Sequence, residues 1–130
     1  MKKRFAPLCL LAAPSHTIAA AAALSLAIPF SASAHAILVD STPRENAVVS
    51  EATFPVELSF NSRIDQSRSK VNLEGLEHST TPLSIEDDPK RPSKLVARVS
   101  GLKPGAYKLH WQVLAVDGHI TRGVISFSVK

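Results

Sequence analysis

Sulfur is nearly absent from this sequence of 130 residues, which contains one cysteine, Cys9, and one methionine, Met1. Both lie in the first 34 residues, where the pattern is that of a removable leader, so a processed chain would hold neither. Disulfides, zinc–thiolate sites and thiol catalysis are therefore excluded for the processed chain. Its stability has to come from a hydrophobic core.

Aromatic residues are also scarce, at 5% of the chain, and no acidic residue occurs before Asp40. The formal net charge of +4 reflects 15 basic and 11 acidic residues, but Lys2, Lys3 and Arg4 supply three of the basic ones. From residue 35 onward the balance is 12 basic to 11 acidic residues. A nucleic-acid-binding domain would need a basic face and aromatic stacking platforms, so this class is disfavoured.

The first 34 residues have the three parts of a secretory signal peptide. A basic start is followed by apolar residues up to Phe30, and then by small residues that end in Ala32-Ser33-Ala34. The apolar run at 18–30 is shorter than the ~20 residues that a membrane-spanning helix needs, although an uncleaved anchor is the alternative. We therefore expect a signal peptide at 1–34, cleaved after Ala34, and one domain at 35–130.

Alternation of apolar and polar residues predicts β-strands along the remaining chain. The longest alternating run, at 107–116, places a set of apolar residues on one face: Tyr107, Leu109, Trp111, Val113 and Ala115. Shorter runs occur at 56–60, 95–99 and 125–129, and turn sequences separate them. About seven strands in this arrangement predict an all-β, immunoglobulin-like antiparallel sandwich or small barrel.

Two segments depart from simple alternation. Leu114 and Val116 make the end of the longest run apolar on both faces, which predicts a central strand covered on both sides there. The segment 76–91 has the least regular pattern, and we expect it to be a long exposed loop.

Cleavage after Ala34 would make His35 the first residue and give it a chemistry that no internal histidine has. Its α-amine and its imidazole Nδ1 can close a six-membered chelate ring on one metal ion. Reference pKa values of about 7.7–8.0 for the amine and about 6.5 for the imidazole let both groups bind a metal near neutral pH. The alternative is a histidine without function at a frayed chain end.

A second group of candidate ligands is Asp117-Gly118-His119, directly after the longest predicted strand. Asp-Gly is first of all a turn signal, and that alternative explains Asp117 and Gly118 but not His119. Around a tight turn, the carboxylate and the imidazole can point to the same side. With His35 they form a set of three nitrogen donors and one oxygen donor, which suits Cu(II) or Ni(II). Zinc is an alternative, whereas calcium and magnesium prefer oxygen ligands.

Other polar residues are expected to have structural or solvent-exposed positions. His110 alternates outward on the longest strand, and His78 lies in the predicted loop, where a second, weaker metal contact is the alternative to an ordinary polar residue. Trp111 faces inward and is expected to anchor the core. The sequence has no nucleophile elbow, phosphate-binding glycine loop or zinc-protease helix, and nothing marks one serine as activated, so we expect no enzyme.

The chain resembles the CopC family of periplasmic copper-binding proteins, which accompany bacterial copper-resistance systems. The resemblance rests on motifs in a fixed order along residues 35–130: His35-Ala36-Ile37-Leu38-Val39-Asp40-Ser41-Thr42-Pro43, Leu58-Ser59-Phe60-Asn61, Leu102-Lys103-Pro104-Gly105-Ala106-Tyr107, Trp111, Val116-Asp117-Gly118-His119 and Gly123-Val124-Ile125-Ser126-Phe127. It implies a seven-stranded Greek-key β-barrel that binds one Cu(II). The implied ligands are the amine and imidazole of His35 together with Asp117 and His119.

The resemblance also implies a periplasmic protein that carries or sequesters copper and exchanges it with an inner-membrane transporter of the CopD kind. Some members have a second site for Cu(I) in a methionine-rich loop with an added histidine. In the corresponding stretch, 73–78, the histidine is present as His78 but the methionines are missing. We therefore expect no thioether site of that type.

One alternative function comes from the enzyme class. An N-terminal histidine chelate with a further histidine on a β-sandwich is also the copper-site arrangement of lytic polysaccharide monooxygenases. The short chain, the lack of outward-facing aromatic residues and a carboxylate ligand in the position that oxygen would need all disfavour that alternative.

Overall fold

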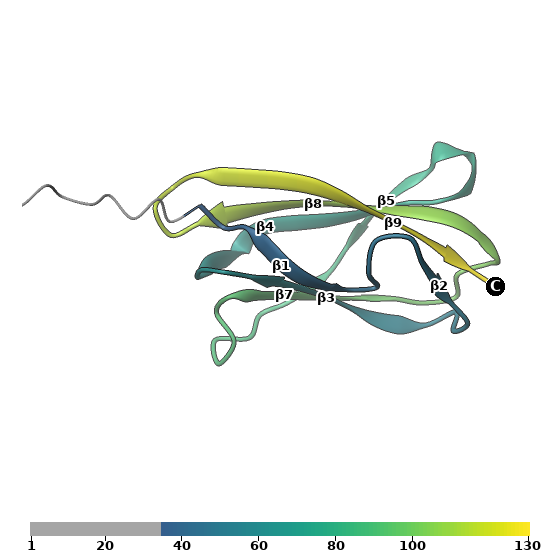
Figure 1. Cartoon of the computed structure of the whole chain (residues 1–130), viewed down its shortest axis with the longest axis horizontal. Helices are drawn as coiled ribbons and strands as arrows, with labels where there is room; N and C mark the ends of the chain where they lie inside the picture. The colour runs from purple at the N-terminus through teal and green to yellow at the C-terminus, as the bar shows by residue number, and fades with distance from the viewer. Residues whose placement is uncertain (1–34) are drawn as a thin grey trace, which may run out of the picture. The chain divides into compact units, whose positions relative to one another are not determined.

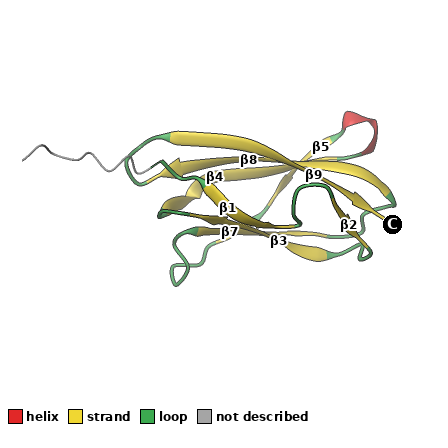
Figure 2. Cartoon of the chain, in the orientation of Figure 1, coloured by secondary structure: helices red, strands yellow, loops and turns green. Residues whose placement is uncertain are grey.

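The computed structural model describes residues 35–130, so the expected signal peptide lies outside the described residues. This part of the chain is all-β, with one short 3₁₀ helix, η1 (Leu76–His78) (Figures 1 and 2). Its strands are β1 (Leu38–Thr42), β2 (Ala47–Val49), β3 (Phe54–Phe60), β4 (Ile64–Glu74), β5 (Thr80–Leu83), β6 (Ile85–Glu86), β7 (Lys94–Val99), β8 (Gly105–Ala115) and β9 (Ile120–Val129). Within these residues no helix has the length and hydropathy to cross a membrane.

The strands form two sheets, which confirms the predicted all-β sandwich. A four-stranded sheet has the order β1-β3-β7-β6, and a five-stranded sheet has the order β2-β9-β8-β4-β5. All neighbouring strands are antiparallel except β2 and β9. β6 has two residues and β2 has three, so seven of the nine described strands have four residues or more.

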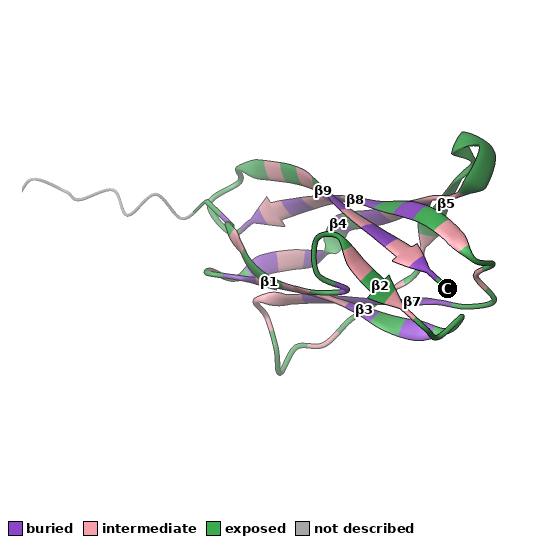
Figure 3. Ribbon diagram, turned by 45° about the vertical axis from the view of Figure 1, so that its right-hand side comes forward, coloured by how far each residue is buried: buried purple, intermediate pink, exposed green. Residues whose placement is uncertain are grey.

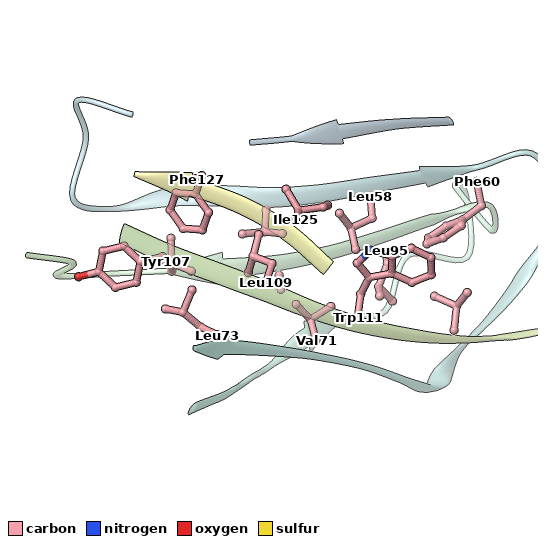
Figure 4. Close-up of a cluster of buried hydrophobic side chains, with 14 of the residues drawn as sticks. Leu58, Phe60, Val71, Leu73, Leu95, Tyr107, Leu109, Trp111, Ile125 and Phe127 are labelled. Carbon is pink, nitrogen blue, oxygen red and sulfur yellow. The ribbon is translucent and has the colours of Figure 1, made fainter. Parts of the chain in front are cut away.

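The hydrophobic core lies between the sheets and follows the predicted alternation. On β8 the inward side chains from Tyr107 to Ala115 are all buried, as are Val56, Leu58 and Phe60 on β3. Figure 3 shows buried positions recurring along the strands, and Figure 4 shows several of the buried side chains, among them Leu58 and Trp111. Trp111 meets Phe60 edge-on, with the ring centroids 5.4 Å apart. Trp111 is thus a core anchor, as predicted.

The sequence pattern did not reveal β4, because a bulge shifts its inward positions. Ile64 and Gln66 are buried, and after the bulge the buried positions continue at Ser69, Val71 and Leu73. The register against β8 is broken between Asp65 and Lys70. An extra residue in one strand reverses the side-chain phase, so a period-two search sees two short fragments instead of one strand of 11 residues.

The prediction of a long exposed loop at 76–91 was wrong in part. The segment contains η1, β5, which pairs with β4, and β6, which pairs with β7. Most of its residues are exposed, but Leu83 and Ile85 pack against the core. β5 and β6 are short and lie at sheet edges, so Leu83 and Ile85 are the apolar residues that indicate them in the sequence.

The expectation that both faces of β8 are covered near Val116 was also wrong. β8 is central in its sheet, between β9 and β4, but the strand ends at Ala115 and Val116 begins the following turn. Val116 is 64% exposed, and Ile120 at the start of β9 is 50% exposed. An antiparallel sheet can leave one face open to solvent, and here the outer face stays open.

Candidate metal centre

The turn between β8 and β9 holds Asp117 and His119 in a defined conformation. Gly118 N donates to Ala115 O (2.9 Å) and Ala115 N donates to His119 O (2.8 Å). Gly118 has a φ of 87°, which glycine adopts at little cost. Asp117 Oδ1 accepts a hydrogen bond from His119 N at 3.0 Å. The turn explanation of Asp-Gly is therefore correct, and the same turn orients both candidate ligands.

The structure brings all three predicted ligands together at one end of the sandwich. Asp117 Oδ2 lies 3.0 Å from His119 Nδ1, and the rings of His119 and His35 have centroids 4.5 Å apart. Figure 1 shows that the described chain begins beside the turn that joins β8 and β9. His35 precedes β1 of the four-stranded sheet, whereas the turn belongs to the five-stranded sheet. The candidate site thus joins the two sheets.

The carboxylate of Asp117 is held in its charged form. Its pKa is lowered, first by the hydrogen bond from the main chain of His119 and then by the His119 side chain, against an opposing effect of desolvation. The nearby His35 also contributes a favourable charge interaction. Asp117 therefore offers an anionic oxygen donor throughout the neutral range.

The spacing of one donor pair, Asp117 Oδ2 and His119 Nδ1, is compatible with a shared metal ion. Two donors bound at right angles, each about 2.0–2.1 Å from an ion, lie about 2.9 Å apart, close to the 3.0 Å between Asp117 Oδ2 and His119 Nδ1. Within residues 35–130, no three His, Cys, Asp or Glu side chains are already placed to hold an ion. The set expected from the sequence includes the α-amine of His35, and this nitrogen is a peptide nitrogen while His35 is joined to Ala34.

The remaining two described histidines meet on one carboxylate that the sequence did not single out. His110 faces outward as predicted, but its Nε2 lies 2.6 Å from Glu74 Oε2, and His78 Nδ1 lies 3.0 Å from Glu74 Oε1. Glu74 pairs with Lys108, far along β8 from the turn at Asp117. His110 and His78 are therefore not brought to the candidate centre, and His78 has a polar partner in Glu74.

The Glu74 contacts predict an unusual acid titration. The hydrogen bonds from His78 and then from His110 lower the pKa of Glu74 from 4.5 to about 2. Because the folded-state pKa is depressed, the carboxylate stabilises the fold fully above the unfolded value and loses this effect as the pH falls toward about 2. We expect the NMR titration of the Glu74 carboxyl carbon to have its midpoint near 2. We also expect the difference in unfolding free energy between the parent protein and Glu74→Gln, measured with urea, to shrink as the pH falls from 4.5 to about 2. A midpoint near 4.5 would contradict the contacts.

Comparison with known proteins agrees with this architecture. The model of the CopC domain family matches residues 38–130. Copper resistance protein C of Xanthomonas campestris pv. juglandis is 37% identical over 107 residues, which cover 77% of this chain and 84% of the relative. The copper transport protein CutJ of Bacillus subtilis (strain 168) is 30% identical over 105 residues, which cover 78% of this chain but only 19% of CutJ.

A solved structure supports the same assignment. The crystal structure of CopC from Methylosinus trichosporium OB3b superposes with a TM-score of 0.70 at 25% sequence identity, covering 74% of this chain and 94% of that chain. The family model, the relatives and this structural neighbour agree with the resemblance seen in the sequence motifs. The chain belongs to the CopC domain family.

Proposed function

We propose that the processed protein binds one Cu(II) through the α-amine and imidazole of His35, the Asp117 carboxylate and the His119 imidazole, and carries or sequesters this ion. The observation that carries the proposal is the meeting of His35 with His119, whose rings lie 4.5 Å apart although they precede different strands of different sheets. Asp117 completes the group from the same turn.

The donor set favours Cu(II) among the divalent ions. Three nitrogen donors and one carboxylate oxygen match the tetragonal coordination of Cu(II), which also stands highest in the Irving–Williams order. The names of two relatives, copper resistance protein C and copper transport protein CutJ, point in the same direction. The processed chain contains no methionine or cysteine, so a soft thioether or thiolate site for Cu(I) is not part of the proposal.

The proposal includes export and a transporter partner. Cleavage of the signal peptide after Ala34 would deliver the protein to the periplasm and free the amine of His35 in the same step. Since this chain matches only 19% of CutJ, a domain of this kind is one part of a longer copper transport protein there. We propose that the present chain exchanges copper with a separate inner-membrane transporter of the CopD kind. Copper transfer that proceeds equally well without such a membrane protein would contradict this step.

We propose that the protein is a binder and not a copper monooxygenase. The aromatic residues of the described chain all lie in the core: Phe54, Phe60, Tyr107, Trp111 and Phe127. They are therefore not available as a platform for a polysaccharide. Reductant-dependent peroxide production by the copper-loaded protein would instead favour the enzyme.

The proposed function is tested by Cu(II) titration of the protein that begins at His35. His119→Ala is expected to weaken Cu(II) binding by about 100-fold or more, because it removes a ligand. Substituting a residue that only hydrogen-bonds a ligand already lowers metal affinity by about 10–100-fold. The EPR spectrum of the variant should show one nitrogen donor fewer on Cu(II) than that of the parent protein. His78→Ala is the matched control, since its side chain is 92% exposed and contacts Glu74. Equal affinity of the two variants would contradict the proposal.

A further inference from the structure

We propose that Asn61 is a positioning residue for the copper site: it fastens the start of the processed chain to β3 so that His35 reaches the turn between β8 and β9. This inference rests on the proposed function. Asn61 acts through His35 and is not itself a ligand.

The antiparallel pairing of β1 and β3 begins at the pair Leu38 and Phe60. Beyond this pair, Asn61 N donates to Ile37 O at 3.0 Å, and Ile37 N donates to the side-chain Oδ1 of Asn61 at 2.8 Å. The chain bends at Asn61, so its side-chain oxygen serves as the acceptor for Ile37 N where β3 has ended. The amide thereby extends the fastening of the N-terminal segment by one residue toward His35.

The neighbouring residue strengthens this arrangement. Ala36, between His35 and Ile37, is fully buried and belongs to the hydrophobic core. Ile37 itself is 59% exposed, so its position depends on its main-chain hydrogen bonds more than on burial. The segment is thus held at two successive residues immediately before the candidate ligand.

This fastening matters because the candidate site is divided between two sheets. His35 belongs to the chain that leads into the four-stranded sheet, while Asp117 and His119 belong to the turn of the five-stranded sheet. If the N-terminal segment detaches from β3, the His35 chelate remains but no longer lies beside the other two ligands. The apparent affinity then falls in proportion to the fraction of chains that keep the competent arrangement.

Substitutions that remove the Asn61 acceptor are expected to weaken Cu(II) binding without abolishing it. A typical hydrogen bond corresponds to about a 5- to 10-fold change in an equilibrium constant. In the protein that begins at His35, Asn61→Leu and Asn61→Ala should each lower the Cu(II) affinity by no more than about this factor, because the affinity follows the fraction of chains that keep the segment attached. Asn61→Asp keeps an oxygen acceptor for Ile37 N and should bind at least as tightly as the parent protein. The protein that begins at His35 keeps the whole described core, because that core consists of residues from Ala36 onward.

Two readouts separate positioning from general stability. Hydrogen exchange of the Ile37 amide should be faster in Asn61→Leu than in the parent protein. Part of the EPR signal of the copper-loaded Asn61→Leu variant should come from Cu(II) bound to His35 without His119. Asn72→Leu on β4, which pairs with His110, is the matched control and should leave affinity and spectrum unchanged. A parent protein that binds no Cu(II) would overturn the proposed function. A parent that binds Cu(II) while Asn61→Leu has the same affinity and spectrum would overturn only the role of Asn61.

Discussion

A chain that keeps the last four leader residues, 31–34, is expected to bind Cu(II) more than 100-fold more weakly than the chain that begins at His35. The extension turns the His35 amine into a peptide nitrogen and removes one donor and the chelate ring. Loss of a ligand should cost more than the 10–100-fold typical of changes around a ligand. Four residues are preferable to one or two, because a histidine in second or third position forms its own chelate with a free amine.

Competition titration and EPR measure this effect. The matched control carries four extra residues after Lys130, where β9 has already ended, and should bind like the parent protein. Mass measurement of protein exported from the full 130-residue chain separately tests cleavage after Ala34. Equal affinity and identical spectra for the extended and parent chains would show that the amine is not a ligand.

Gly123→Ala is expected to destabilise the fold by about 3 kcal/mol, at the upper end of the usual cost of overpacking a core. Gly123 on β9 pairs with Trp111 on β8. A Cβ at this position would lie against the indole ring, 2.6 Å from Cε2 and 2.9 Å from Nε1 of Trp111. Trp111 is buried and also meets Phe60 edge-on, so the ring cannot shift without disturbing the core.

Urea unfolding with three further variants, Gly75→Ala, Trp111→Phe and the double variant Gly123→Ala/Trp111→Phe, identifies the cause. Gly75→Ala is the control, because a Cβ there would meet only ordinary contacts, 3.4 Å from Ser79 Oγ and 3.5 Å from Tyr107 Cε1. It should change the stability by no more than about 0.5 kcal/mol. Combining Gly123→Ala with Trp111→Phe should recover part of the loss, since the smaller ring makes room for the methyl group. Additive effects of the two changes would argue against the clash.

The part of the fold that alternation predicts is the part where strands are long and regular. The inward residues of β8, from Tyr107 to Ala115, were predicted correctly because each inward position is apolar. β4 was missed because its bulge reverses the phase between Gln66 and Ser69. Val116 was misplaced because composition does not reveal where β8 stops and its turn begins.

The candidate site was predicted in a different way. The chelating capacity of His35 follows from its position after Ala34, but its proximity to His119 depends on how two sheets pack, and no local pattern contains that information. The resemblance to the CopC family supplied the expectation that His35 lies beside His119, and the 4.5 Å between the centroids of the two rings agrees with that expectation. The hydrogen bonds of Asn61 and Glu74 were not predicted, because Asn61 was seen only as part of a motif and the partners, Ile37 and the histidines, are main-chain or long-range neighbours. The copper ligands themselves remain a prediction.

The division of the site between the two sheets means that a bound ion would act as a cross-link. It would tie the first residue of the processed chain to the turn at Asp117–His119, near the other end of the sequence, and thereby close a loop that includes most of the domain. An ion that binds only the folded arrangement stabilises it by mass action. Copper loading would therefore make the protein more resistant to unfolding and to proteolysis, so that a chain carrying copper outlasts an empty one.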